Sequence, residues 1–111
     1  MCKKLRLLLL VLAAALSAAP VYAQDPKLVE AGKKEGKVTV YGSLETDSAE
    51  AVFKVFRQKS GIDLEYWRAS STKVMDRALT EYRAGKPGFD VILTNDNPMQ
   101  IMSREGIFAN Y

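Results

Sequence analysis

Beyond residue 25, the spacing of apolar positions switches repeatedly between a helical period and a strand period. Two longer segments carry apolar residues three and four positions apart, which predicts amphipathic helices. Three shorter runs are rich in β-branched and aromatic residues, which predicts strands. Proline near a first turn and glycine after a last turn mark further helix ends. The predicted elements are helices at 26–35, 47–59, 71–84 and 97–105 and strands at 37–41, 62–67 and 89–93.

Helices and strands alternate along this segment and are joined by only a few residues each. That order predicts an α/β fold with a parallel sheet and helices on both of its faces. The strand at 62–67 alternates apolar and polar residues and is expected at an edge, whereas the apolar run Val91-Ile92-Leu93 is typical of a central strand. The expected strand order therefore begins 2-1-3, with a topological switch point between the first and third strands.

Local signals also predict where helices begin and end. Asp47 and Glu50 resemble a capping box, and Gly61 is placed to end the helix that they open. Asn97 is expected to cap the last helix, with Pro98 at its first position.

Residues 1–23 have the features of a secretory signal peptide, which we call the leader. Basic residues precede an apolar run from Leu7 to Ala19, and Val21-Tyr22-Ala23 forms a small-residue cleavage site. The apolar run has 13 residues, whereas a membrane span needs roughly 20. We therefore expect export to the periplasm with cleavage after Ala23, which leaves a mature segment at 24–111.

The composition narrows the function classes. The 16 basic and 13 acidic residues give a net charge of +3, but three of the basic residues lie in the leader. The mature segment therefore has no net charge and no basic stripe, which argues against nucleic-acid binding. The single cysteine, Cys2, precedes the apolar run of the leader, so we expect neither a lipoprotein nor a disulfide. Because histidine is also absent from the sequence, thiolate metal sites and imidazole catalysis are excluded for the mature segment.

Three small polar loops follow the three predicted strands, at 42–46, 68–71 and 94–97. Ligands of open parallel sheets bind beyond the carboxyl ends of the strands. Each loop also leads into a helix N-terminus, where free N–H groups favour anions and polar oxygens. The candidate ligand-binding residues are Ser43, Glu45, Thr46, Ser70, Ser71, Thr94 and Asn95.

These residues have a second interpretation. Serine, threonine, aspartate and asparagine are common helix caps, so the same side chains can serve only their own helices. Glu45 can meet a cation or a ligand amine, or it can be a solvated loop acid. Trp67 and Arg68 can stack on or clamp a ligand, or Trp67 can pack beneath the neighbouring helix.

Enzyme signatures are missing from the sequence. It contains no glycine-rich nucleotide loop, no nucleophile elbow and no histidine to act as a base. We therefore expect no catalysis, no cofactor and no resident metal.

Four segments match a known family in their order and spacing. They are the leader, the run EAGKKEGKVTVY that ends at Tyr41, a helix with Phe56 followed by Gly61-Ile62, and the run GFDVIL that ends at Leu93. Together they resemble the start of bacterial periplasmic solute-binding proteins of ABC importers. The resemblance is to the type II group, which includes ferric-iron-binding proteins and relatives for phosphonates, polyamines and thiamine, and it runs from about residue 27 to residue 110.

The resemblance implies two α/β lobes that close on a ligand like a clamshell and then dock on a membrane permease. The resemblance extends over most of the first lobe and over none of the second. Residues 24–111 are therefore expected to be an incomplete N-terminal lobe. The implied function is the capture of a small polar solute in the periplasm by a monomeric protein, without catalysis.

The resemblance also bears on iron. Iron-binding relatives can offer a histidine from the first loop and a glutamate from the third, and the matching positions here hold Glu45 and Asn95. Glu45 keeps a hard oxygen ligand for a ferric ion, whereas Asn95 lacks the second charge. Ferric iron, a small anion and another polar solute stay as alternatives, and Glu45 is a metal ligand only if the solute is ferric iron.

Two other functions stay open at this point. One is an exported enzyme whose catalytic groups lie beyond Tyr111. The other is a small secreted domain that binds a partner protein.

Overall fold

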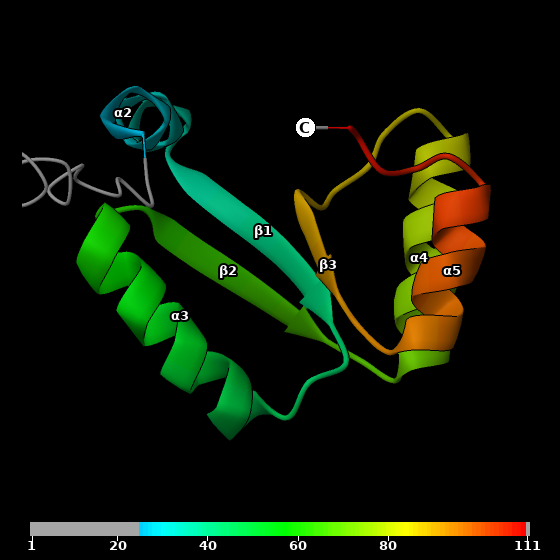
Figure 1. Cartoon of the computed structure of the whole chain (residues 1–111). Coiled ribbons are helices and arrows are strands. Elements are labelled where there is room, and N and C mark those ends of the chain that lie inside the picture. Colours follow the sequence, from blue (N-terminus) through cyan, green and yellow to red (C-terminus); the bar gives the residue numbers. More distant parts are fainter. Residues whose placement is uncertain (1–24, 111) are drawn as a thin grey trace, which may run out of the picture.

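A computed structural model describes residues 25–110, which form four helices and three strands (Figure 1). The leader lies outside the described residues. All the predicted helices and strands are confirmed, each to within two residues at either end. The elements are α2 at Pro26–Glu35, β1 at Lys37–Gly42, α3 at Thr46–Ser60, β2 at Asp63–Arg68, α4 at Ser71–Arg83, β3 at Val91–Leu93 and α5 at Asp96–Arg104.

The three strands form one parallel sheet in the order β2-β1-β3. β1 pairs with β2 along its whole length, in the register that sets Tyr41 opposite Trp67. β3 pairs only with the second half of β1, where Tyr41 lies opposite Ile92. The predicted parallel sheet and its 2-1-3 order are therefore confirmed.

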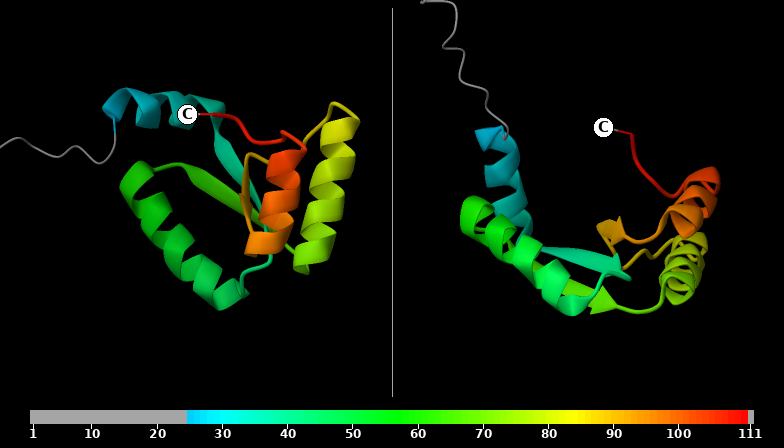
Figure 2. Two further views of the ribbon diagram at one scale, coloured as in Figure 1. Left: turned by 45° about the vertical axis from the view of Figure 1, so that its right-hand side comes forward. Right: turned by 60° about the horizontal axis from the view of Figure 1, so that its bottom comes forward.

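Helices cover both faces of the sheet, as predicted (Figure 2). α3 packs on β1 and β2 on one face, and α4 and α5 pack on β1 and β3 on the other. Because successive side chains of a strand point to opposite faces, neighbouring residues of β1 belong to different cores. The α3 core contains Val40, Ala49, Phe53 and Leu64, and the α4–α5 core contains Tyr41, Val74, Ala78, Leu79, Ile92 and Met102.

The start of α3 differs from its prediction, whereas its end agrees. Glu45 occupies the N-cap position without a side-chain capping bond, and Asp47 lies inside the first turn. The predicted capping box is therefore wrong, because the helix begins before Asp47, and Glu50 instead accepts a hydrogen bond from Arg57. Gly61 ends the helix as predicted: it adopts a left-handed φ of 69°, and its N–H donates to the Arg57 carbonyl.

α5 also begins earlier than predicted. The helix starts at Asp96 with Asn95 at the N-cap position, so Asn97 is not the cap and Pro98 is the third residue of the helix. Proline fits there because an N–H in the first turn of a helix has no intrahelical acceptor. The fully buried Met102 then fixes α5 in the core that it shares with α4.

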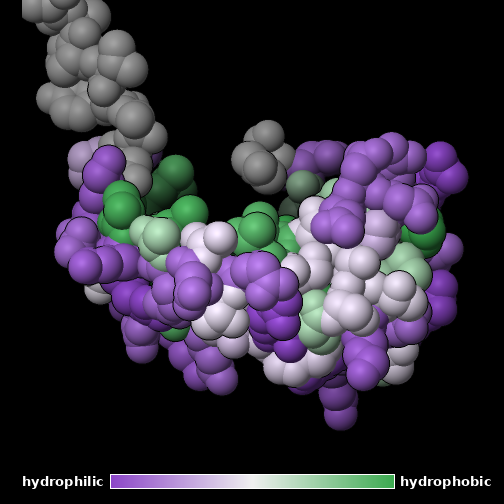
Figure 3. All heavy atoms as spheres, turned by 90° about the horizontal axis from the view of Figure 1, so that it is seen from below, coloured by the Kyte–Doolittle hydropathy of each residue, from purple (hydrophilic) through white to green (hydrophobic). Residues whose placement is uncertain are grey.

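β3 forms an edge of the sheet in the described part of the chain, although its continuous apolar run predicts a central strand. Ile92 is buried beneath α4 and α5, but Val91 and Leu93 are 47% and 37% exposed, because α3 packs on β1 and β2 instead. Val52 on α3 is likewise 60% exposed, although it shares the apolar spacing of Ala49, Phe53 and Phe56. Apolar side chains gather around the hollow between the α2–α3 side and the α4–α5 side (Figure 3).

Glu81 on α4 joins three parts of the fold. Its carboxylate accepts hydrogen bonds from the Tyr41 hydroxyl at 3.1 Å, from Arg77 Nε at 2.7 Å and from the backbone N–H of Gly88 at 2.8 Å. Burial alone would raise the pKa of Glu81, but these three hydrogen bonds outweigh it and lower the pKa below its ordinary value. The ionised carboxylate therefore holds the turn before β3 against α4 and β1.

Glu81→Gln should lower the free energy of unfolding at pH 7 by about 1.5–3 kcal/mol, the range for hydrogen bonds to a charged group. Because folding lowers the pKa of Glu81, its stabilisation is complete above the pKa of the unfolded chain and is lost as the pH falls through the folded-state pKa. Urea unfolding of the complete chain at pH 7 and at about pH 3 should therefore show a smaller difference between wild type and variant at the lower pH.

Glu30→Gln is the matched control, because it removes an exposed ion pair with Lys33 and should change stability little. A stability loss in Glu81→Gln that is as small as in the control, or that does not change with pH, would contradict the role of the carboxylate.

Candidate functional site

The carboxyl ends of the three parallel strands meet at one edge of the sheet, and a loop leaves from each. Backbone hydrogen bonds extend the strand pairing into these loops. The N–H of Ser43 donates to the Leu93 carbonyl at 2.9 Å, and the N–H of Ala69 donates to the Gly42 carbonyl at 3.0 Å. The loops after β1 and β2 are therefore fixed to the neighbouring strand ends.

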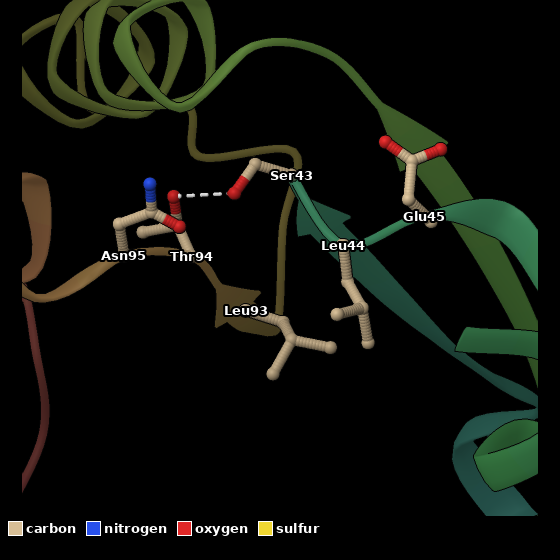
Figure 4. Close-up of a pocket in the computed structure, with 6 residues that line it drawn as sticks. All are labelled: Ser43, Leu44, Glu45, Leu93, Thr94 and Asn95. Atoms are coloured by element: carbon tan, nitrogen blue, oxygen red, sulfur yellow. Dashed lines mark hydrogen bonds between the residues drawn. The ribbon is translucent and has the colours of Figure 1, made fainter. Parts of the chain in front are cut away.

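Ser43 and Thr94 come together across the β1–β3 pair. Their hydroxyl oxygens lie 2.9 Å apart, so one hydroxyl donates to the other (Figure 4). Asn95 lies beside this pair, whereas the Glu45 carboxylate points away from it. These residues line a cavity of about 250 Å³, which we call the strand-end cavity, whose lining residues are Ser43, Leu44, Glu45, Leu93, Thr94 and Asn95.

The loop after β1 is held by β2. Glu45 forms an ion pair with Arg68, and the Leu44 carbonyl accepts hydrogen bonds from Arg68 Nε at 3.1 Å and from the Tyr66 hydroxyl at 2.8 Å. Burial raises the pKa of Tyr66 more than Arg68 and the hydrogen bond to Leu44 lower it, so the phenol is protonated at neutral pH. The Glu45 side chain is 79% exposed, and its cation is Arg68 of the same chain, so its contact with a ligand stays a prediction.

The helix N-termini at this edge differ in their capping. Ser70 accepts a hydrogen bond from the N–H of Lys73 at 3.4 Å and so caps α4. The side chain of Asn95 makes no capping bond to α5, and the residue at the N-cap of α3 makes none either. The first N–H groups of α3 and α5 therefore lack a side-chain acceptor and can bind a polar ligand.

The structure separates the predicted site residues into two groups. The apolar side chains of Leu44 and Leu93 also line the cavity. They were not predicted, because the candidates were chosen among polar loop residues, although each leucine adjoins a predicted hydroxyl residue in the sequence. Ser43, Glu45, Thr94 and Asn95 line the strand-end cavity, whereas Thr46, Ser70 and Ser71 do not.

The donor set at this edge has little capacity for a metal ion. Within residues 25–110, no group of three or more histidine, cysteine, aspartate or glutamate side chains could hold one. Glu45 is the acid of the strand-end cavity, and Arg68 already neutralises it. Hydroxyl, amide and backbone N–H groups remain, which suits a hydrogen-bonding solute or a small oxyanion.

No protein-family model matches the chain, and it matches no curated protein. Across residues 25–110, every helix is too short or too polar to cross a membrane. The resemblance to periplasmic solute-binding proteins therefore stays a prediction from the sequence.

Gly42 leaves no room for a side chain where β1 ends. A Cβ at this position would lie 2.7 Å from the Tyr66 ring and 2.8 Å from the Leu93 carbonyl oxygen. Gly42→Ala should therefore lower the free energy of unfolding by about 1–3 kcal/mol, the usual effect of overpacking. Urea unfolding of the complete chain measures this loss.

Gly32→Ala is the matched control for that substitution. Its new Cβ would meet only the flexible end of the Ile62 side chain, and alanine is favoured in a helix. If Gly42→Ala were no more destabilising than Gly32→Ala, the close approach of the three strands at Gly42 would be wrong.

Proposed function

We propose that the chain forms the first lobe of an exported solute-binding protein, which captures a small polar solute and delivers it to the membrane permease of an ABC importer. The observation that carries the proposal is the contact between the Ser43 and Thr94 hydroxyls at 2.9 Å, which joins the loops after β1 and β3. The switch point of this sheet lies between these two strands, and open parallel sheets bind their ligands at such a point.

The size of the strand-end cavity favours a site completed by a second lobe. Its volume of about 250 Å³ is below the range of roughly 300–1,000 Å³ that is usual for small-molecule sites. In a type II clamshell, a second lobe closes over the same edge and encloses the solute. We therefore assign Ser43 and Thr94 to one wall of a two-walled site in a monomeric protein.

The donors at this edge favour a small oxyanion or another hydrogen-bonding solute over ferric iron. The hydroxyls of Ser43 and Thr94 and the amide of Asn95 line the cavity, and the N-termini of α3 and α5 have no side-chain caps. Glu45, the one candidate ligand for iron, is paired with Arg68. The proposal assigns no catalysis and no cofactor to the chain.

Replacing both hydroxyls should weaken solute binding without unfolding the protein. Each net hydrogen bond contributes about 0.5–1.5 kcal/mol, so the double variant Ser43→Ala with Thr94→Ala should bind about tenfold more weakly. Binding is read from the rise in Tm of the complete protein, both lobes included, with millimolar inorganic phosphate, sulfate, methylphosphonate, ferric citrate or spermidine, because a ligand stabilises the folded state by mass action.

Ser103→Ala is the control for this test, since Ser103 is exposed near the end of α5 and does not line the cavity. The proposal would be overturned if no compound of this panel raised Tm. It would also be overturned if the double variant bound as tightly as wild type and Ser103→Ala.

We also propose that the leader directs the chain to the periplasm and is removed after Ala23. A bacterial host should then yield a periplasmic product whose mass, measured by intact mass spectrometry, corresponds to a chain that begins at Gln24. Ala23→Tyr should block this cleavage, because the position before the scissile bond requires a small residue. Tyr22→Phe is the control, since the preceding position tolerates large residues, and a cytoplasmic product that keeps residues 1–23 would contradict the proposal.

A further inference from the structure

A second cavity lies on the face of the sheet that α4 covers, and we call it the α4 groove. Its volume is about 390 Å³, within the range of roughly 300–1,000 Å³ for small-molecule sites. It shares no lining residue with the strand-end cavity. Its walls include Tyr41, Glu65 and Trp67 on the strands and Arg77, Glu81 and Lys86 on α4 and the turn that follows it.

Flat groups line one wall of the α4 groove. The rings of Tyr41 and Trp67 lie 5.0 Å apart between centroids, and the Arg77 guanidinium carbon lies 4.6 Å from the Tyr41 centroid and 4.4 Å from that of Trp67. Trp67 therefore packs against α4, as one of its two interpretations predicts, and it is only partly buried. Because Glu81 also binds Arg77 Nε at 2.7 Å, the guanidinium is held in place before any ligand arrives, which lowers the entropic cost of binding.

The charged residues that line the α4 groove are two acids, Glu65 and Glu81, and two bases, Arg77 and Lys86. Arg77 is paired with Glu81, and Glu65 is paired with Lys37. Lys86 makes no ion pair with any residue that the structure describes. Among the described residues, Lys86 is therefore the charged side chain of this lining that no ion pair neutralises.

The Tyr41 phenol does not offset this charge. Burial, and then its hydrogen bond to the Glu81 carboxylate, raises the pKa of Tyr41 above its ordinary value. The phenol is therefore neutral at pH 7 and acts as a donor to Glu81.

We propose that the α4 groove binds a small aromatic carboxylate. Its ring stacks on Trp67 and on the guanidinium plane of Arg77, both of which favour flat aromatic partners. Its carboxylate is bound by Lys86 Nζ in a charge-assisted hydrogen bond. A ligand without the carboxylate loses the contact with Lys86, and a ligand without a flat ring loses the stacking.

The fluorescence of Trp67 tests this site directly, because Trp67 is the only tryptophan of the chain. Titration of the complete chain with benzoate should give a saturable change in that fluorescence. Benzamide lacks the charge and cyclohexanecarboxylate lacks the flat ring, so each should bind at least about fivefold more weakly, the loss of roughly one interaction. Lys86→Gln should weaken benzoate binding by about tenfold, the contribution of one hydrogen bond to a charged group.

Lys54→Gln is the control for Lys86→Gln, because Lys54 is an exposed lysine on α3 at the other face of the sheet, and it should bind benzoate like wild type. The double variant of Ser43 and Thr94 should also bind benzoate normally, which separates this site from the strand-end cavity. The proposal is wrong if benzoate gives no saturable change, or if Lys86→Gln binds benzoate as tightly as Lys54→Gln.

Discussion

The rest of the structure depends on the pairing of β1 with a parallel strand on each side. Val40 and Tyr41, next to each other on β1, are each 3% exposed and belong to the two separate cores. The register of β1 with β2 and with β3 decides which side chains α3, α4 and α5 can cover. Glu81 strengthens this arrangement from α4, because it binds the Tyr41 hydroxyl and the turn before β3.

The same pairing creates both cavities. At the end of β1, Gly42 allows the three strands to approach closely, and the next residue, Ser43, meets Thr94 after β3. On the α4 face, the register sets Tyr41 opposite Trp67, which gives the α4 groove its aromatic wall. The strand-end cavity therefore depends on where β1 ends, and the α4 groove depends on which side chains of β1 face α4.

The sequence predicted the elements and their order well, because apolar spacing and turn residues are local signals. It predicted the strand-end edge for the same reason, since parallel strands bring their carboxyl ends together. It could not predict the contact between Ser43 and Thr94, which are 51 positions apart, or the pairing of Glu45 with Arg68, because both depend on strand register. The starts of α3 and α5 were each missed by one residue because several capping residues adjoin them. The exposure of Val91 depends on which face α3 covers.

NMR scalar couplings across hydrogen bonds in the complete chain test most directly whether β1 holds the neighbouring loops at one edge of the sheet. We expect a coupling between the N–H of Ser43 and the Leu93 carbonyl, and another between the N–H of Ala69 and the Gly42 carbonyl, across bonds of 2.9 Å and 3.0 Å. The absence of both couplings, with both amides exchanging with water as fast as in an unfolded chain, would contradict this arrangement of β1 and the site built on it.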